Sequence, residues 1–391
     1  MDNRNHSHSS GNSRGSQTRR PSAPRTASSN HYNTGSGNID RYNYVDRDIY
    51  SNSSANRNRK KPIRRKKHTG RKIVITLVLL AFIAVGFGMV YFHVMASRLN
   101  RSGGVNSSVL AKYTQLPSGA PSWDVKNDGR VMNILLLGVD ENPEDQSDGR
   151  SDTNLLLSVD SKSKTMRLVS FLRDSYLEIP KHGKDKLNTA YENGGVALTM
   201  ATLENNYRVN IDKFVSTNFN NFAAIVDKMG GLDVPMTAEA CAQSNANIGT
   251  HLKAGTNHLN GKQALYYARI RNAWDKFGHD DYGRTGRQRQ VIELMIQKMK
   301  SMNVLQSSKI MYDYLPLVKT NLTDSDLAYL GAVVAPSLSS YKTQTQQMPA
   351  PNTFDDQQDI KGVGKVVTLD LEKNCEILRR FLYGDVSSSG N

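Results

Sequence analysis

Two aspartates and an arginine lie at the ends of two short apolar runs. The run of residues 131–139 is followed directly by Asp140, and the run of residues 153–159 is preceded by Arg150 and Asp152. Carboxylates and a guanidinium at strand ends are the residue types that hold a metal ion and a phosphate group. This combination predicts an enzyme that handles phosphate.

A third apolar run, residues 165–172, follows the second after a short polar turn and ends at Arg173 and Asp174. Short apolar runs bounded by turn residues are typical of β-strands, and so short a connection predicts a hairpin. In a hairpin the start of one strand lies beside the end of the next. Arg173 and Asp174 should therefore lie near Arg150 and Asp152. If the first two strands are also antiparallel neighbours, the aspartate after the first run joins the same cluster.

The densest cationic stretch outside the N-terminal region spans residues 266–289. Arg269 and Arg271 are two residues apart, so they face the same way if the chain is extended there. Arg284 and Arg287 are three residues apart at the start of an expected helix, where they share a face. Arginines at a helix N-terminus cost stability unless an anion is bound, which indicates a pyrophosphate site. A solvated face paired with the two aspartates before this helix explains the stretch equally well.

Two further features bear on ligands. Lys186 and Asn188 lie in a polar segment, residues 184–195, which we expect to be a loop leading into a helix, and both are possible ligand contacts. No histidine has metal-ligand spacing, and no zinc-protease, nucleotide-binding or serine-hydrolase motif occurs in the sequence. Aspartates without histidines favour a hard cation such as Mg²⁺ over Zn²⁺.

Strands and helices are mixed over residues 125–385 without a linker that would divide them. The sequence therefore predicts one α/β domain with a central β-sheet flanked by helices. Further strands are expected at residues 213–217 and 366–371. Helices are expected at residues 196–207, 221–229, 284–300 and 375–382.

The N-terminal 72 residues are rich in Asn, Ser, Arg and Gly and nearly free of aliphatic side chains, which predicts disorder. They carry 17 Lys and Arg against 4 Asp, a net charge of +13. The rest of the chain holds 34 basic against 32 acidic residues, a net charge of +2. The folded part therefore gives no electrostatic reason to expect specific binding of nucleic acid.

Residues 73–95 form an uncharged apolar run that is long enough to cross a bilayer as a helix. Ten Lys and Arg lie between Arg57 and Lys72, which places the N-terminus in the cytoplasm. A cleaved signal peptide is the alternative, but its apolar core would be shorter. We expect a single-pass cell-membrane protein with the following parts: a disordered cytoplasmic tail (1–72), a transmembrane helix (73–95), an extracytoplasmic stalk (96–124), the folded domain (125–385) and a C-terminal tail (386–391).

The chain has two cysteines, Cys241 and Cys375, in no C-x-x-C arrangement. They form one disulfide in an extracytoplasmic domain, or they are two unpaired thiols that pack as small hydrophobic side chains. The sequence leaves both alternatives open.

Eight segments within residues 133–288 closely resemble the LytR-CpsA-Psr family of Gram-positive cell-envelope proteins, and they occur in that family's order. They are NILLLGVD at 133–140, GRSDT at 149–153, VSFLRD at 169–174, KLNTAY at 186–191, GGLDV at 230–234, GKQAL at 261–265, YARIR at 267–271 and DYGRTGRQ at 281–288. The family's last segment often continues as Arg-Gln-Gln, where this chain has Arg-Gln-Arg289.

The resemblance implies a phosphotransferase on the outer face of the membrane. Such an enzyme moves a glycopolymer, such as teichoic acid or capsular polysaccharide, from an undecaprenyl-pyrophosphate carrier onto peptidoglycan. By the family pattern Asp140 and Asp152 hold Mg²⁺ or Mn²⁺. Arginines and one lysine bind the pyrophosphate, namely Arg150, Arg173, Lys186, Arg269, Arg271, Arg284 and Arg287. The proton of the attacking hydroxyl would pass to Asp174 or to a metal-site aspartate.

Two other functions remain open on the sequence. The first is a polyprenyl-pyrophosphate hydrolase with water as the acceptor. The second is a membrane-bound envelope regulator whose basic tail binds DNA in a salt-dependent way. The charge of the tail is also explained by membrane topology and by attraction to anionic lipid.

Overall fold

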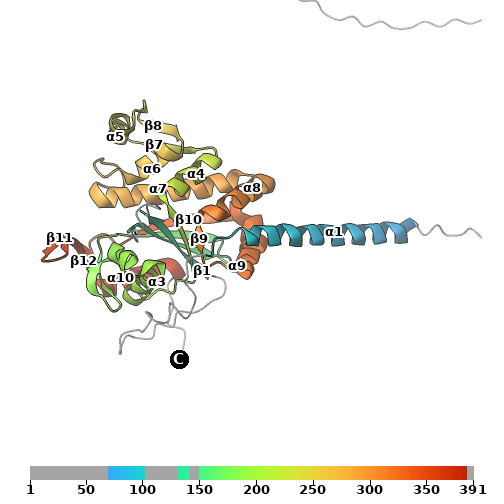
Figure 1. The fold of residues 1–391 in the computed structure, drawn as a ribbon, viewed down its shortest axis with the longest axis horizontal. Helices are drawn as coiled ribbons and strands as arrows, with labels where there is room; N and C mark the ends of the chain where they lie inside the picture. Colours follow the sequence, from blue (N-terminus) through green and yellow to red (C-terminus); the bar gives the residue numbers. More distant parts are fainter. Residues whose placement is uncertain (1–68, 102–130, 141–148, 385–391) are drawn as a thin grey trace, which may run out of the picture. The chain divides into compact units, whose positions relative to one another are not determined.

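The computed structural model describes residues 69–101, 131–140 and 149–384. A six-stranded mixed sheet lies at the centre of the folded domain, with the strand order β10-β3-β2-β1-β6-β9 (Figure 1). Its strands are β1 (Val131–Val139), β2 (Ser151–Asp160), β3 (Thr165–Phe171), β6 (Lys213–Asn218), β9 (Lys319–Thr320) and β10 (Lys342–Met348).

The pairing of these strands confirms the two neighbour relations expected from the sequence. β1 and β2 are antiparallel, and β2 and β3 form the predicted hairpin. β1 is also parallel to β6, and β3 is parallel to β10. The C-terminal end of β1, the start of β2 and the C-terminal end of β3 therefore meet at one edge of the sheet.

Helices cover both faces of this sheet, so the predicted mixed α/β architecture is confirmed. α3 (Leu187–Tyr207) and α10 (Leu371–Tyr383) lie against one face, and α7 (Asp280–Ser301) crosses the other (Figure 1). A further layer packs on α7. It consists of α4 (Phe219–Lys228), α5 (Ala238–Ile248), α6 (Gly261–Arg269) and the hairpin of β7 (Leu232–Met236) and β8 (Gly255–Leu259).

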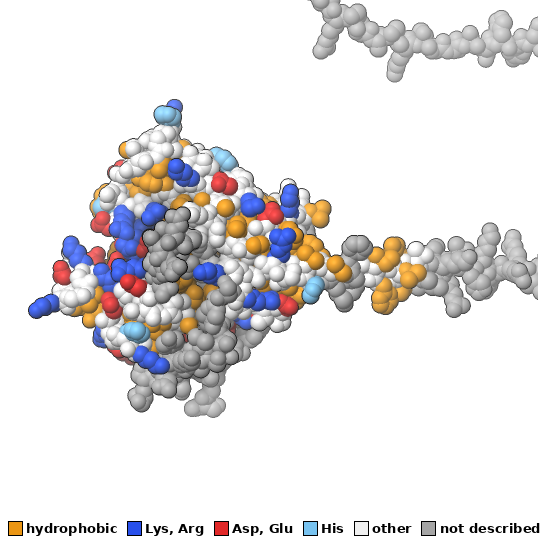
Figure 2. Space-filling model, viewed as in Figure 1, with side chains coloured by type: hydrophobic (Ala, Val, Ile, Leu, Met, Phe, Trp, Pro, Cys, Tyr) orange, Lys and Arg blue, Asp and Glu red, His pale blue; other side chains and the backbone are white. Residues whose placement is uncertain are grey.

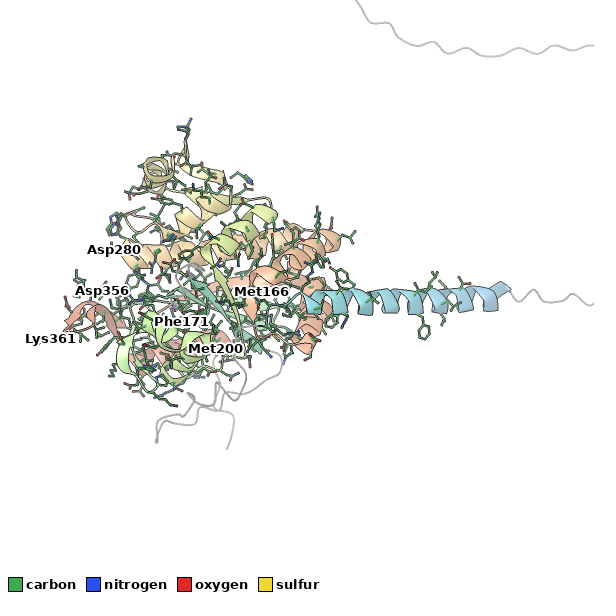
Figure 3. All side chains as sticks on the ribbon, in the orientation of Figure 1. Met166, Phe171, Met200, Asp280, Asp356 and Lys361 are labelled. Carbon is green, nitrogen blue, oxygen red and sulfur yellow. The ribbon has the colours of Figure 1, made fainter. Side chains whose placement is uncertain are left out.

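The remaining elements lie at the margins of the domain. Two hairpins are formed by β4 (Tyr176–Ile179) with β5 (Gly183–Lys186), and by β11 (Phe354–Ile360) with β12 (Gly364–Leu369). Asp356 and Lys361 mark the outer end of the second hairpin in Figure 3. The other helices are α1 (Thr69–Ser97), α8 (Val304–Tyr314) and α9 (Asp324–Tyr329), with short helical turns at Leu315–Leu317, Leu330–Val334 and Ala335–Ser340.

The main apolar core lies between the sheet and the α3–α10 layer. Alternate residues of β1 (Leu135, Leu137 and Val139) point into it, as the two-residue period of a strand requires. Phe171 of β3 and Met200 of α3 belong to the same cluster (Figure 3). A second apolar cluster joins α5, α6, α7 and the β7–β8 hairpin. The two clusters hold the two sides of the site described below.

Helix α3 differs from the sequence prediction at its start. The segment at residues 184–195, expected to be a loop, is the end of β5 followed by a first helical part of α3. Leu187, Ala190 and Tyr191 are buried there, and this apolar face stabilises the helix despite its polar neighbours. The helix is broken at Gly195, whose φ of 60° and ψ of −151° only glycine adopts readily.

The predicted membrane span lies within α1. Among the helices in the described part of the chain, none is found that is long and apolar enough to cross a membrane, so the span is not confirmed. The predicted tail, most of the stalk and the C-terminal tail lie outside the described residues. The first stalk residues contact the domain, because Thr320 donates its backbone N–H to the Asn100 carbonyl at 3.1 Å and Arg101 pairs with Asp324.

Both cysteines are buried free thiols, so the disulfide alternative is wrong. Cys241 belongs to the apolar cluster of α5, whereas Cys375 of α10 donates its thiol hydrogen to the carbonyl of Asn206 at 3.2 Å. Burial raises the pKa of the Cys375 thiol to about 11, which keeps it protonated. Both side chains serve as small packing residues.

Candidate active site

Asp152 is the extra residue of a β-bulge in β2. In the β1–β2 ladder Gly138 pairs with Thr153 and Val139 pairs with Ser151, so Asp152 has no partner. A Cβ atom on Gly138 would lie only 2.9 Å from the Thr153 Cβ, and glycine allows this close approach. A bulge bends its strand and re-aims a side chain, as bulges beside active sites often do.

The two strands remain connected beyond the bulge. The Asp140 backbone N–H donates to the Arg150 carbonyl at 3.1 Å, which keeps the end of β1 beside the start of β2. The structure thus brings Asp140, Arg150 and Asp152 to one edge of the sheet. The side chains of Asp140 and Arg150 are exposed there, whereas that of Asp152 is half-buried.

Arg173, directly after β3, connects three carboxylates at this edge. Its Nη1 lies 2.5 Å from Asp152 Oδ1, and its Nε lies 3.6 Å from Asp174 Oδ2 and 3.5 Å from Asp281 Oδ1. Burial opposes the charge of Arg173, but the carboxylates of Asp281 and Asp152 outweigh it and raise the pKa of the guanidinium. Arg173 is therefore charged and fixed in place before any ligand arrives.

Asp281, in the first turn of α7, organises the arginines on the opposite side. Its Oδ1 lies 2.7 Å from Arg284 Nη2 and 4.0 Å from Arg271 Nε. Burial raises the pKa of Asp281, although the nearby arginines act against this shift. Burial likewise lowers the pKa of Arg284. The sequence prediction did not place Asp281 in the site, although its three-residue spacing from Arg284 was a signal for the pair.

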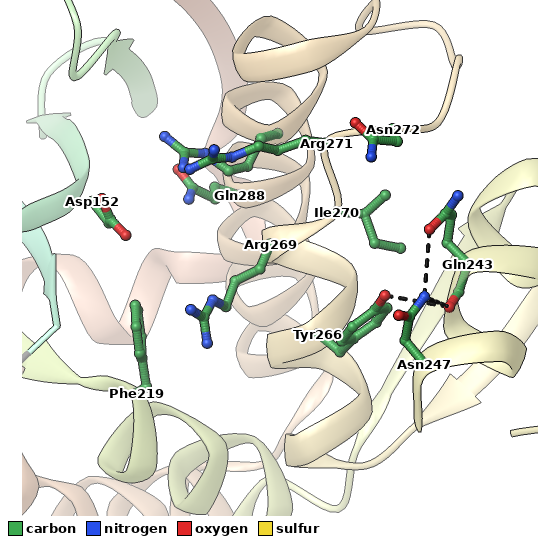
Figure 4. Close-up of a pocket in the computed structure, with 11 residues that line it drawn as sticks. Asp152, Phe219, Gln243, Asn247, Tyr266, Arg269, Ile270, Arg271, Asn272 and Gln288 are labelled. Atoms are coloured by element: carbon green, nitrogen blue, oxygen red, sulfur yellow. Dashed lines mark hydrogen bonds between the residues drawn. The ribbon is translucent and has the colours of Figure 1, made fainter. Parts of the chain in front are cut away.

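A pocket of about 390 Å³ opens between β2, α4, α5, α6 and α7 (Figure 4). Of the side chains predicted for the site, Asp152, Arg269, Arg271 and Arg284 line it. The guanidinium of Arg269 lies 4.4 Å from the centre of the Phe219 ring, which fixes its direction by a cation–π contact. The pocket also includes residues that the sequence did not indicate, namely Phe219, Gln243, Asn247, Tyr266, Ile270, Asn272 and Gln288.

Three predicted side chains do not line this pocket but lie around Arg173. Arg150 Nε lies 2.7 Å from Glu192 Oε2 in α3, and this hydrogen bond raises the pKa of Arg150. Lys186 Nζ lies 3.4 Å from Asp174 Oδ1. Asp174 is thus held between Lys186 and Arg173.

Arg287 is fully buried and points away from the pocket lining. It donates to the Ile270 carbonyl at 2.6 Å and to the Ala273 carbonyl at 3.3 Å, and its Nη1 lies 2.6 Å from Asp275 Oδ2. It therefore anchors the loop that carries Arg271 rather than facing the pocket as the sequence suggested. Gly286 makes room for this loop, since a Cβ atom there would lie 2.3 Å from the Phe277 Cβ.

The arginine that departs from the family pattern, Arg289, has a separate role. Its guanidinium donates to the hydroxyl of Ser170 in β3, and burial lowers its pKa. Arg289 thus joins α7 to the sheet, and it does not line the pocket.

The donor set at the sheet edge suits a hard divalent cation. Asp140 and Asp152 offer carboxylate oxygens, and Arg173 occupies only Oδ1 of Asp152. Mg²⁺ uses one or two carboxylates together with substrate phosphates and water, so two aspartates are enough. Among the described residues no group of three or more His, Cys, Asp or Glu is placed to hold a metal. Asp140 and Asp152 are the residues that could hold such a metal together with a diphosphate.

The charges of the site are visible on the molecular surface. On the face shown in Figure 2, Lys and Arg side chains gather beside Asp and Glu side chains near the N-terminal end of α7. Figure 4 shows Arg269 and Arg271 between Asp152 and Phe219 on one side and Asn272 on the other. Such a collection of fixed guanidinium groups binds an anion with several oxygens.

Comparison with known proteins supports this interpretation. Residues 102–378 match the model of the LytR_cpsA_psr family. The chain is 40% identical over 198 residues to the polyisoprenyl-teichoic acid–peptidoglycan teichoic acid transferase TagU of Bacillus mycoides (strain KBAB4). This match covers 50% of the chain and 62% of TagU, which is less than two thirds of that protein.

A second relative and a set of solved structures are also similar. The chain is 32% identical over 262 residues to the regulatory protein MsrR of Staphylococcus aureus (strain COL), covering 67% of the chain and 77% of MsrR. The crystal structure of B. subtilis TagT shares 28% identity at a TM-score of 0.51, with 69% of this chain and 97% of TagT covered. TagT bound to LIIa-WTA gives 27% identity and a TM-score of 0.52, covering 65% and 91%.

Proposed function

This chain belongs to the LytR_cpsA_psr family, and we propose that it transfers a glycopolymer from a polyprenyl-pyrophosphate carrier, of the undecaprenyl type, to peptidoglycan. The observation that carries the proposal is the set of three arginines in one pocket, Arg269, Arg271 and Arg284, with Asp152 opposite them. The pyrophosphate of such a carrier is an anion with the charge and oxygen count that this set matches.

The reaction is a phosphoryl transfer. A sugar hydroxyl of peptidoglycan attacks the phosphorus atom next to the glycopolymer, and the bond from this phosphorus to the bridging oxygen breaks. Polyprenyl phosphate leaves with the electron pair, and the arginines stabilise the negative charge that develops. No covalent enzyme intermediate is required.

The proton of the attacking hydroxyl passes to a carboxylate. Asp152 is the only carboxylate among the described residues that line the pocket. Asp152 and Asp174 both pair with Arg173, at 2.5 and 3.6 Å, so pairing does not separate them. The position of Asp152 in the pocket lining favours Asp152 over Asp174 for the role.

We further propose that Asp140 and Asp152 hold Mg²⁺ or Mn²⁺ when the diphosphate is bound. The metal would neutralise charge on the phosphate oxygens. Asp140→Asn and Asp152→Asn should each abolish the response of transfer to added Mg²⁺ in chelator-treated protein, while the melting temperature is retained. Full transfer in excess chelator would remove the metal from the mechanism.

We propose that the reaction takes place at the outer face of the cell membrane, where the lipid carrier would be held. The exposed apolar side chains of α1, including Leu77, Leu80 and Phe82, support contact of this helix with a lipid bilayer. The basic residues before this helix support the proposal that the N-terminus is in the cytoplasm and the domain on the outer side.

The test is a transfer assay with the full chain in detergent, a labelled polyprenyl-pyrophosphate-linked glycopolymer and peptidoglycan. Wild-type protein should move label onto peptidoglycan. Arg271→Ala should lower the rate about 10- to 100-fold, the loss of one charge-assisted contact. The control is Arg380→Ala, which removes an exposed arginine of α10 that lies outside the pocket and pairs with Glu376 at 2.9 Å. Label released into water with peptidoglycan present would instead identify a hydrolase, and unchanged transfer by Arg271→Ala would contradict the proposed site.

A further inference from the structure

Helix α8 exposes large apolar side chains that the folded domain does not use. Leu305 is 84% exposed, and Met311 is exposed as well. A leucine with so little contact adds almost nothing to the packing of its own domain. Lys309 is also exposed, and it forms no ion pair within the part of the chain that the structure describes. α8 therefore presents a surface that is both apolar and basic.

The helical period separates this surface from the side on which α8 is held. Leu305, Lys309 and Tyr312 follow the spacing i, i+4, i+7 and therefore share one face of the helix. Tyr314 lies nine residues, about two and a half turns, after Leu305 and so points the opposite way. Its hydroxyl donates to the Ile225 carbonyl of α4 at 2.7 Å. α4 thus holds α8 from the side opposite Leu305.

The end of α1 contacts the outward face of α8. Arg98, directly after α1, donates to the Tyr312 hydroxyl, and its guanidinium lies 4.1 Å from the centre of the Tyr312 ring. Ala96 and Leu99 on either side of this arginine are buried. Together with the backbone bond to the Asn100 carbonyl, these contacts fasten the domain within three residues of the end of α1. α8 is thereby kept close to the level at which α1 ends.

The exposed apolar side chains of α1 continue to this junction. Tyr91, Val94 and Arg98 follow the spacing i, i+3, i+7 and share a face of the helix, and all three are exposed. This stripe leads through Arg98 to Tyr312 and on to Leu305. A surface that joins α1 so directly meets the medium around α1, and the proposed function places α1 in contact with lipid.

The chemistry of the outward face fits the interface of a bilayer. Leucine reaches the acyl boundary, tyrosine lies at the level of the headgroups, and lysine extends its ammonium to lipid phosphate. A basic residue near an anionic leaflet is attracted to it. The only acidic residue of α8, Asp313, lies 3.9 Å from Lys228 Nζ, so its charge is already paired. This combination favours an anionic bilayer over an acidic or apolar protein partner.

We propose that the outward face of α8, with Leu305, Lys309 and Tyr312, rests on the outer leaflet of an anionic bilayer. The inference rests on the lipid contact proposed for α1 and adds a second contact, which the folded domain itself makes. A single helix lets the domain turn about the junction, whereas two contacts fix its tilt. The pocket is then presented to the lipid carrier in one orientation.

Tryptophan fluorescence in bilayers tests this contact. The full chain is placed in nanodiscs of phosphatidylcholine and phosphatidylglycerol, with or without bromine on the acyl chains, and bromine quenches tryptophan within its reach. The emission of the two native tryptophans is subtracted. In Leu305→Trp the added emission should be largely lost in brominated nanodiscs. The melting temperature should stay at the wild-type value, because Leu305 is exposed.

A matched control and a charge variant complete the design. Gln357→Trp replaces an exposed side chain of the β11–β12 hairpin and should keep its added emission. Lys309→Ala, combined with Leu305→Trp, should reduce the quenching in nanodiscs that contain phosphatidylglycerol and leave it unchanged in phosphatidylcholine alone. Quenching that does not depend on Lys309 in either lipid would overturn its assignment to lipid phosphate.

Phe82→Trp in α1 separates the contact of α8 from the one on which it rests. Quenching of Phe82→Trp without quenching of Leu305→Trp overturns the contact of α8 and leaves the lipid contact of α1 intact. Absence of quenching in both variants overturns both contacts. Blue-shifted emission of Leu305→Trp that bromine does not quench identifies a protein on this face, and this result also overturns the proposal.

Discussion

At the scale of single residues, the arginines of the site differ in what holds them. Arg269 is exposed, and its guanidinium contacts the ring of Phe219. Arg173 neutralises three carboxylates, so its loss would leave them facing one another. Arg287 is buried, and its guanidinium donates hydrogen bonds to the backbone. Ligand binding and folding should therefore respond to different arginines.

Arg269→Ala should impair the reaction without unfolding the protein. The exposed cation–π contact contributes about 0.5–1 kcal/mol to stability. The lost contact to a bound pyrophosphate costs about 1.5–3 kcal/mol. Urea unfolding and titration with geranyl pyrophosphate measure the two effects. A loss of stability as large as the loss of affinity would show that Arg269 is structural.

Arg287→Ala should have the opposite profile. It leaves Asp275 and two carbonyl groups without their buried partner, and removal of one partner of a buried ion pair costs about 3–5 kcal/mol. Arg287→Lys should not restore stability, because an ammonium lacks the planar fork that reaches these acceptors together. The free energy of unfolding of both variants tests this expectation. Full stability of either variant would contradict the role of Arg287 as a buried anchor of the loop.

At the scale of elements, α7 and the loop before it behave as one unit. Gly286→Ala places a methyl carbon only 2.3 Å from the Phe277 Cβ, so the loop that carries Arg271 must move away from the helix. We expect a lower melting temperature together with weaker pyrophosphate binding. Gly331→Ala is the control, since a Cβ atom there meets nothing within 4 Å. Wild-type behaviour of Gly286→Ala would show that the loop does not depend on this approach.

The end of α3 should make stability depend on pH. Burial raises the pKa of Glu204 from 4.5 to about 7, while its carboxylate accepts the Ile211 N–H at 2.9 Å. Between pH 4.5 and 7 the unfolded chain releases this proton and the folded chain keeps it. The free energy of unfolding should therefore fall as pH rises, by about 3 kcal/mol for a shift of this size. Glu204→Gln should flatten this part of the pH profile, and an unchanged slope would refute the assignment.

The elements that the sequence predicted correctly are those with a clear apolar period. The runs that became β1, β2 and β3 carry that period, and their short connection fixed the hairpin. The first part of α3 was missed because most of its residues are polar. The few apolar residues that anchor it, such as Leu187 and Tyr191, therefore give no clear pattern. Asp281 and Arg287 were misjudged for a related reason. Which charge faces a ligand depends on how the loop packs on α7, and spacing alone does not encode that packing.

At the scale of the whole molecule, the basic N-terminal region should be separable from the reaction. A chain that lacks residues 1–56 keeps the apolar helix and every pocket residue. We expect it to transfer glycopolymer at the wild-type rate in the detergent assay. The full chain at matched protein concentration is the control. A loss of transfer on deletion would favour the alternative in which the tail carries the function.

The bulge in β2 has a further consequence for what selection can act on. Because Gly138 already faces Thr153 and Val139 already faces Ser151, excision of Asp152 would leave an unbroken ladder with every other pairing intact. The sheet has no use for this residue, and a strand one residue shorter would be more regular. Asp152 is thus an insertion that the strand pairing does not need and that the proposed reaction uses. Its persistence in a chain would report on that reaction and on the ion pair with Arg173, and not on the pairing of the two strands.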